Sequence, residues 1–187
     1  SKITDKIPAG CYTTLRTFQG DKVLAFKKHI DRLKESALVV GRELNIPETQ
    51  LKSVIRNLLP DKKVDWRVRV IIDLTKIIGE VYICVEPLPE IKPSFYKRGI
   101  DTRTMMVLRP NPSAKLTQFI HQTISVRKKL HGLTSEVLIT DSTGNILEGL
   151  TSNFFAIRNS VVYTAGNDIL SGTTREILLR ILDKLSI

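Results

Sequence analysis

Alternating apolar residues in the middle of the chain constrain its fold more than any other feature. Apolar side chains stand at every second position of residues 66–74, and charged side chains stand at most of the positions between them. This period of two is typical of a β-strand. A second strand is predicted over residues 80–86, with Val81, Ile83 and Val85 on one face. No helix separates the two segments, so we predict that they pair as antiparallel strands.

Two strands and two helices are predicted on the N-terminal side of this pair. Residues 12–18 and 22–26 have the composition of strands. Apolar residues three and four positions apart predict a helix over about residues 26–40, with its stripe ending at Val40. A similar pattern predicts a second helix over residues 47–59. The first half of the chain is therefore expected to mix α and β structure.

Prolines mark the expected boundary between two lobes. Three prolines fall within residues 87–93, and such a cluster ends regular structure. We expect an N-terminal small α/β lobe over residues 1–109 and a C-terminal lobe over residues 110–187. The first lobe is expected to end with a strand at 101–109. In the second lobe we expect strands at 136–140, 145–148, 153–157 and 161–164 and helices at 115–130 and 174–185. The buried face of the last helix is expected at Ile177, Leu178, Ile181, Leu182 and Leu185.

A strong positive charge limits the classes of partner. The 187 residues include 29 Lys and Arg against 19 Asp and Glu, which gives a net charge of +10. This balance fits nucleic acid, a membrane surface or a phosphorylated small molecule. The basic residues are spread over many segments and aromatic residues make up only 6%, which disfavours nucleic acid. No apolar run approaches the ~20 residues of a membrane span. We therefore expect neither nucleic acid nor membrane as a partner.

Cysteine and histidine usage narrows the possibilities further. Two cysteines, Cys11 and Cys84, are too few for a disulfide framework, so we expect a reducing, cytoplasmic location. The three histidines stand in no metal-ligand spacing, and we predict no metal site. The sequence also contains no Walker loop, no G-x-G-x-x-G fingerprint and no G-x-S-x-G elbow.

Two basic residues stand in settings that allow more than one interpretation. Taken alone, Arg32 fits one more cation on a lysine-rich solvated face. Lys115 follows two prolines and opens a predicted helix, where the helix dipole favours anions over cations. It is either an exposed lysine that tolerates this cost or a lysine whose amine is held neutral as a nucleophile.

Two other segments combine small polar residues with free backbone groups or a charge. Glu148 is followed by a glycine and by small polar residues up to Asn153, which is unlike a strand chosen for packing, although a solvated turn also explains it. Residues 170–175 open the last helix with Gly and Thr, whose N–H groups and hydroxyls form a natural phosphate seat. An ordinary threonine cap explains this segment about as well.

Together the four segments supply a basic arginine, an unusual lysine, an isolated carboxylate and a phosphate seat, which is what pyridoxal phosphate (PLP) chemistry requires. Residues 10–18 are similar to a G-x-Y/F-E-T-L segment, and residues 29–37 closely match H-x-x-R-L-x-x-S-A. Residues 136–155 carry the most specific block, and residues 169–175 match L-x-G-I-T-R. In this order the segments resemble the class IV aminotransferases, the fold type IV PLP enzymes, over nearly the whole chain.

The resemblance implies a role for each matching residue. Lys115 would form the internal Schiff base, and Glu148 would accept the proton of the pyridine nitrogen. Arg32 would hold the cofactor phosphate, with Thr173 and Thr174 cradling it at the helix start. Three further positions complete the implied set: Thr151 near the cofactor, Leu170 packed on its ring and Tyr12 facing the substrate.

The resemblance also implies an activity. A PLP-dependent aminotransferase would act on an amino acid and a 2-oxo acid, with the released Lys115 amine as general base and acid. Elimination from the same bound substrate would instead give a 4-amino-4-deoxychorismate lyase. A shortened relative without a complete site would be a structural or interaction module.

The fold implied by the resemblance is α/β (α+β-like) and has two lobes. An antiparallel sheet with two helices is followed by an incomplete barrel-like sheet with helices. In the family a further stretch completes the second lobe, so the C-terminal, cofactor-binding lobe is expected to be truncated here. The family is commonly dimeric, and a homodimer is expected.

Overall fold

The computed structural model describes residues 7–129 and 136–187 of the chain. The chain divides into two compact units. The first contains the residues up to Glu90 together with Ala114–His121, and the second contains Ile91–Ser113 together with Gln122–Ile187. The domain boundary expected between residues 109 and 110 stays a prediction.

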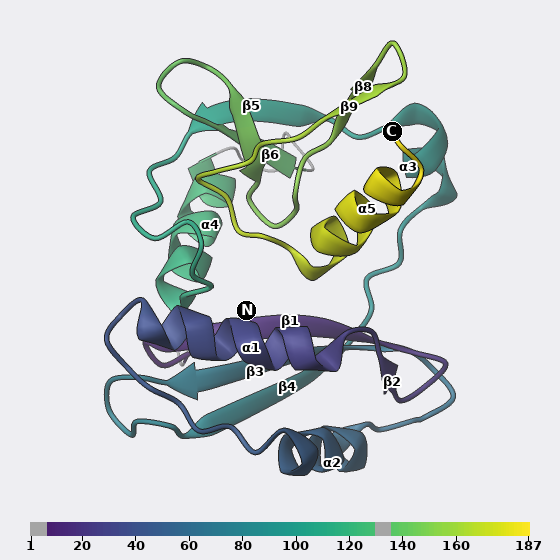
Figure 1. The fold of residues 1–187 in the computed structure, drawn as a ribbon. Coiled ribbons are helices and arrows are strands. Elements are labelled where there is room, and N and C mark those ends of the chain that lie inside the picture. Colours follow the sequence, from purple (N-terminus) through teal and green to yellow (C-terminus); the bar gives the residue numbers. More distant parts are fainter. Residues whose placement is uncertain (1–6, 130–135) are drawn as a thin grey trace. The chain divides into compact units, whose positions relative to one another are not determined.

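A four-stranded antiparallel sheet forms the framework of the first unit (Figure 1). Its strands follow the order β2-β1-β3-β4. Their bounds are β1 (Gly10–Phe18), β2 (Lys22–Val23), β3 (Trp66–Asp73) and β4 (Val81–Pro87). The predicted antiparallel pairing of the two central segments is confirmed, with Val68 opposite Val85 and Val70 opposite Ile83.

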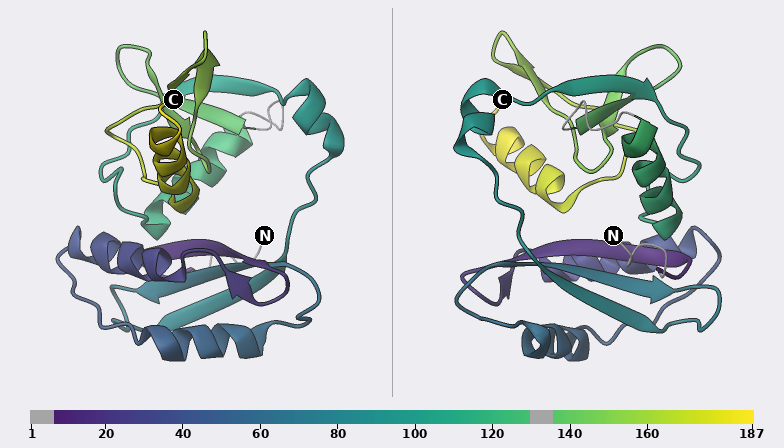
Figure 2. Two further views of the ribbon diagram at one scale, coloured as in Figure 1. Left: turned by 45° about the vertical axis from the view of Figure 1, so that its right-hand side comes forward. Right: turned by 180° about the vertical axis from the view of Figure 1, so that it is seen from behind.

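Two helices, α1 (Phe26–Leu38) and α2 (Glu48–Leu58), cover one face of this sheet (Figure 2). Their apolar stripes pack on alternate residues of the strands, which explains why a period of two and a period near four occur in one chain. The core that results contains Cys11, Leu15, Phe26, Ile30, Leu33, Ala37, Ile46, Leu51, Ile55, Leu59, Val68, Val70, Ile72 and Leu74.

The first helix is shorter than the sequence predicts. Phe26, Ile30, Leu33 and Ala37 are buried as expected, but Val40 lies beyond the helix and is 43% exposed. The predicted strand over 22–26 is also short, because α1 already begins at Phe26.

Burial makes Cys11 an inert part of this core. The thiol is fully buried, and this desolvation raises the pKa of Cys11 to about 12. Only the thiolate is a good nucleophile, so Cys11 has a packing role.

Asp73 holds the connection between β3 and β4 in place. Its carboxylate accepts the backbone N–H groups of Thr75 at 2.7 Å, Lys76 at 3.0 Å and Ile77 at 3.3 Å. The Thr75 hydroxyl donates to the same carboxylate at 3.1 Å. These bonds, led by the one from the Thr75 backbone, lower the pKa of Asp73. The turn therefore depends on an ionised carboxylate.

The described residues of the second unit form two small sheets. A three-stranded sheet has the order β5-β6-β7, in which β5 and β6 are parallel and β6 and β7 antiparallel. A two-stranded antiparallel sheet pairs β8 with β9. The strand bounds are β5 (Thr102–Met106), β6 (Glu136–Thr140), β7 (Ile146–Gly149), β8 (Ala156–Arg158) and β9 (Val161–Tyr163). Over the described residues these strands do not close into a barrel, in keeping with the predicted mixed α/β fold.

Three helices follow β4 over the described residues, and none of them matches the sequence prediction in full. They are α3 (Pro93–Arg98), α4 (Thr117–Lys129) and α5 (Thr173–Lys184). The sequence did not predict α3, which has six residues and no buried side chain. The helix expected from residue 115 begins at Thr117, so Lys115 precedes it, and residue 130 lies outside the described residues. No helix in the described ranges is long and apolar enough to cross a bilayer.

The predicted buried face of α5 is wrong in this structure. Ile181 is 47% and Leu185 62% exposed, and Ile177, Leu178 and Leu182 are half-buried. Thr173 is the buried residue of this helix. Periodicity identified the apolar stripe correctly, but a stripe alone does not determine which element covers it.

Replacing Asp73 with Asn tests the turn. Asp73→Asn is expected to lower the melting temperature by several degrees near pH 7, because it removes the charge that the surrounding N–H groups stabilise. The pKa of Asp73 is lowered in the folded protein relative to about 3.9 in an unfolded chain. The stabilisation is therefore complete above about pH 4 and is lost as the pH falls through the folded-state pKa.

Thermal unfolding of the wild type and Asp73→Asn across this pH range measures the effect. The gap between the two melting temperatures should narrow in acid, whereas Asp183→Asn, at an exposed position of α5, should show almost no gap. A gap of constant size at all pH values would contradict the role given to the Asp73 charge.

Candidate functional site

The backbone of Lys115 is held on both sides within the first unit. Its N–H donates to the Ser36 hydroxyl of α1 at 2.9 Å. Its carbonyl accepts the Tyr12 N–H of β1, also at 2.9 Å, and the next residue, Leu116, forms a β-bridge with Cys11. The segment around Lys115 is thus fixed to both a helix and a strand of the core.

The side chain of Lys115 lies over an aromatic ring. Its Nζ is 5.1 Å from the centroid of the Tyr12 ring, within range of a cation–π interaction. Lys115 is half-buried. Because α4 begins two residues later, its position at a helix start, predicted from the sequence, is wrong. Its setting comes from the strand and the helix that hold its backbone.

Thr117 strengthens this anchor, and sequence reasoning missed it. Its hydroxyl accepts the Gly10 N–H at 2.9 Å, and its proton is within reach of the Pro8 carbonyl at 3.0 Å. Thr117 and Ser36 are each 1% exposed. A threonine two residues after a lysine carries no signal in the sequence, because its partners are more than a hundred residues away.

Arg32 and His29 lie on the buried side of α1, and the charge of Lys115 acts on His29. The residues are 9% and 7% exposed, so the interpretation of Arg32 as a solvated surface cation is wrong. Burial, and then the positive charges of Arg32 and Lys115, lower the pKa of His29 to about 4. His29 shares a 2.8 Å hydrogen bond with the Thr13 hydroxyl and is neutral at pH 7. Burial also lowers the pKa of Arg32, although an arginine remains a cation.

Glu148 carries a buried carboxylate in the second unit. The residue is 4% exposed, so the interpretation as a solvated turn is wrong. Its Oε2 accepts the Leu170 N–H at 3.1 Å and the Asn153 side-chain amide at 3.3 Å. Its Oε1 forms an ion pair with Nη1 of Arg109. The carboxylate is therefore fixed by donors from three separate segments.

The turn before β7 helps to position Glu148. The side chains of Asn145 and Thr143 donate to Asp141, and these bonds lower the pKa of Asp141 to about 2. The register of β6 against β7 shifts between Thr140, which pairs with Ile146, and Ile139, which pairs with Glu148. A charged aspartate thus organises the connection that leads into the Glu148 strand.

Thr151 is held by a different carboxylate. Its hydroxyl donates to Glu136 at 3.0 Å and accepts Arg127 at 3.5 Å. The Ser152 hydroxyl donates to the same Glu136 oxygen at 3.1 Å. Within the second unit, the structure therefore directs the Thr151 side chain toward Glu136, while Glu148 is held by Asn153 and Leu170.

The start of α5 is joined to Glu148 through Asn153. The Asn153 amide donates to the Leu170 carbonyl at 2.8 Å as well as to Glu148. Gly172, which has no side chain, takes the N-cap position, so the alternative of an ordinary threonine cap is wrong. Thr173 is buried and Thr174 exposed.

Two residues of this arrangement were not among the sequence predictions. Arg109 and Asn153 both donate to Glu148. Asn153 stood inside a segment already singled out, whereas Arg109 is 39 residues from Glu148 and gives no local signal. In the described ranges no three His, Cys, Asp or Glu side chains are grouped so that they could hold a metal ion.

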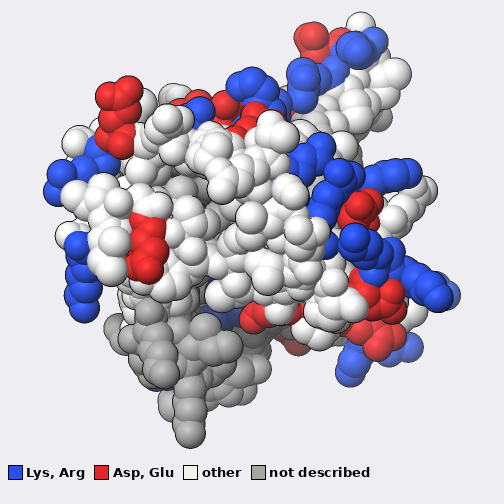
Figure 3. All heavy atoms as spheres, turned by 90° about the horizontal axis from the view of Figure 1, so that it is seen from below, with Lys and Arg blue, Asp and Glu red and all other residues white. Residues whose placement is uncertain are grey.

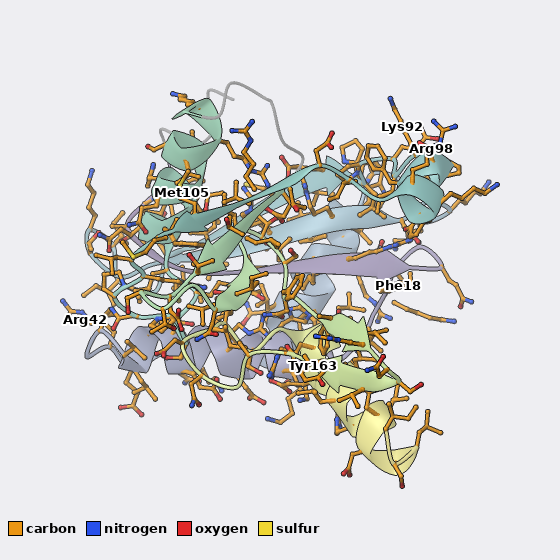
Figure 4. The ribbon with its side chains drawn as sticks, turned by 90° about the horizontal axis from the view of Figure 1, so that it is seen from above. Phe18, Arg42, Lys92, Arg98, Met105 and Tyr163 are labelled. Carbon is orange, nitrogen blue, oxygen red and sulfur yellow. The ribbon has the colours of Figure 1, made fainter. Side chains whose placement is uncertain are left out.

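The excess positive charge is distributed over the surface. On the face drawn in Figure 3, Lys and Arg side chains form several groups with Asp and Glu between them. Figure 4 shows Lys92, just before α3, and Arg98, its last residue, pointing away from the ribbon. Arg32 is an exception to this pattern, because it is buried.

Known proteins are similar to this chain in sequence and in fold. A D-alanine aminotransferase of Staphylococcus epidermidis is 23% identical over 205 residues, covering 90% of this chain and 64% of that protein. A branched-chain aminotransferase of Thermoproteus uzoniensis, solved with norvaline, is 21% identical with a TM-score of 0.78, covering 96% and 67%. A hypothetical aminotransferase of Mycobacterium tuberculosis in its PLP-bound form is 18% identical with a TM-score of 0.78, covering 95% and 69%.

The similarity to these structures shows the fold, and a family model shows the family. The structural likeness confirms the predicted fold class. The chain spans only 65% and 64% of the length of two curated relatives that it matches. The family model for class IV aminotransferases matches residues 10–187. Because this match covers nearly all of the sequence, the chain belongs to the class IV aminotransferase family.

Proposed function

We propose that this chain binds PLP through Lys115 and serves in an aminotransferase that acts on an amino acid and a 2-oxo acid. The observation that carries the proposal is the burial of two charged residues with complementary tasks. Arg32, in the first unit, is 9% exposed, and Glu148, in the second unit, is 4% exposed. Surface charges with no specific role stay in water, because burying a charge is costly.

The chemistry of the residues fits the chemical groups of PLP. A phosphate dianion suits a buried guanidinium and the N–H groups at a helix start, which Arg32 and α5 offer. A protonated ring nitrogen suits a carboxylate such as Glu148. An aldehyde suits the primary amine of Lys115. The family and a PLP-bound relative of the same fold add support.

Each residue of the proposed site then has a role in the reaction. When bound, PLP supplies an electron sink for the carbanion formed at the α-carbon of the amino acid. Lys115 Nζ takes up and delivers the proton at that carbon. Glu148 holds the proton at the ring nitrogen, and Arg32 anchors the phosphate together with Thr173 and Thr174 at the start of α5. The remaining positions are Tyr12 toward the substrate, Leu170 against the ring and Thr151 near the cofactor.

The wider setting is part of the proposal. We expect a homodimer in the cytoplasm without nucleic acid, membrane or metal partners, and lobes that divide between residues 109 and 110. Both cysteines are free thiols, which suits a reducing compartment. The activity concerns the whole protein, since the relatives are longer than this chain.

Cofactor attachment gives the first test. The purified protein mixed with PLP should develop an absorbance band near the visible edge, and borohydride reduction should fix the cofactor on the peptide that contains Lys115. Mass spectrometry of the digest locates the modification. Lys115→Ala should lose the band and the label, because it removes the amine. Lys52→Ala, at an exposed position of α2, should retain both.

Labelling at other lysines with none at Lys115 would contradict the proposal. If attachment occurs, an amino acid supplied without a 2-oxo acid should yield 2-oxo acid up to one equivalent of bound PLP. A lyase would instead release pyruvate from aminodeoxychorismate, and a structural module would do neither.

A glycine next to the proposed phosphate seat gives a second test. An added Cβ at Gly172 would lie 2.1 Å from Asn153 Oδ1, so Gly172→Ala must displace Asn153. The hydrogen bond from Asn153 to charged Glu148 contributes about 1.5–3 kcal/mol of interaction free energy, and this displacement removes it. Because Glu148 is the proposed partner of the ring nitrogen, we expect PLP affinity to fall about tenfold or more.

Fluorescence titration with PLP measures this affinity. Gly166→Ala is a matched control, because a Cβ there meets no atom within 4 Å. Equal PLP affinities for the two alanine variants would refute the link between Asn153 and the cofactor. Melting temperatures of both variants show whether folding, rather than binding, has changed.

A further inference from the structure

The side chain of Arg109 is buried although neighbouring residues of the chain are exposed. It follows β5 in a stretch where Met106 is 63% and Leu108 80% exposed. The Arg109 side chain, in contrast, is only 9% exposed. An arginine at a loop position can reach water easily, so its burial requires a partner that compensates for desolvation.

The partner of Arg109 is the carboxylate that the proposed function places at the cofactor ring. Arg109 Nη1 donates to Oε1 of Glu148, while Leu170 and Asn153 donate to Oε2. The Glu148 side chain is 5% exposed. The neutral donors orient one oxygen, but Arg109 is the cation that forms an ion pair with the other oxygen. A buried carboxylate stays ionised when such a charge is in direct contact.

We propose that Arg109 is a positioning residue that keeps Glu148 ionised and oriented toward the ring nitrogen of PLP. This inference rests on the proposed function. Arg109 acts through Glu148 and does not itself touch the cofactor. An ion pair that only stabilises the loop after β5 would leave the cofactor unaffected, so the two roles differ in a measurable way.

A double-mutant cycle on PLP affinity separates these roles. Arg109→Met should weaken PLP binding about tenfold in the wild type, but by less than about twofold when Glu148 is already Gln. Arg109→Lys keeps the charge and should restore affinity to within about threefold of the wild type. The absorbance spectrum of bound PLP should shift in Arg109→Met toward that of Glu148→Gln.

Two controls protect the interpretation. Arg16→Met removes an arginine that is paired with Asp65 at 3.0 Å on the exposed surface, and it should leave PLP affinity and the spectrum unchanged. If Arg109→Met does not fold, because Glu148 is left buried without its cation, Arg109→Gln replaces it in the cycle with Glu148→Gln, since its amide removes the charge but can still donate to the carboxylate.

The outcomes distinguish this inference from the proposed function. A wild-type protein that does not bind PLP removes the proposed function, and the inference with it. A wild-type protein that binds PLP, with equal effects of Arg109→Met in both backgrounds or an unshifted spectrum, overturns the inference alone. Coupling between the two substitutions together with rescue by Lys supports it.

Discussion

Pairing between β1 and β3 fixes the part of the first unit on which the candidate site depends. The register places Tyr12 opposite Ile71. A shift by one residue would exchange the two faces of β1, moving Cys11 out of the core and turning Tyr12 into it. The start of the same strand also holds the Lys115 backbone. The apolar core that sets this register thus also sets the position of Lys115. The same packing therefore stabilises the first unit and places the proposed reactive amine.

Buried charge is the second constraint, and it separates functional side chains from the many surface ones. Leaving water costs an ionised group several kcal/mol, and other charges or hydrogen bonds must compensate. Glu148 is compensated by Arg109 and by the amides of Asn153 and Leu170. The net charge of +10 therefore says little by itself. What matters is that Arg32 is buried, while most of the other described Lys and Arg residues are exposed.

The sequence predicted the strands and core helices well, because alternating and four-residue periods directly reflect burial on one face. It missed α3, which is short and buries no side chain. It placed Lys115 at the start of a helix, because nothing local shows that its backbone bonds to Ser36 and Tyr12. The sequence did not point to Arg109 for the same reason, because its proposed role depends on a contact with Glu148, 39 residues away. Periodicity reports on local burial, whereas long-range polar contacts appear only in the folded chain.

The proposed function requires that the buried charges of this chain form a binding site for PLP. A crystal structure of the protein with PLP tests it most directly, because it locates the cofactor relative to both units. We expect continuous electron density from Lys115 Nζ to the cofactor, with the ring nitrogen at Glu148 and the phosphate at Arg32. PLP bound elsewhere, or a cofactor at Lys115 whose ring nitrogen lies away from Glu148, would contradict it.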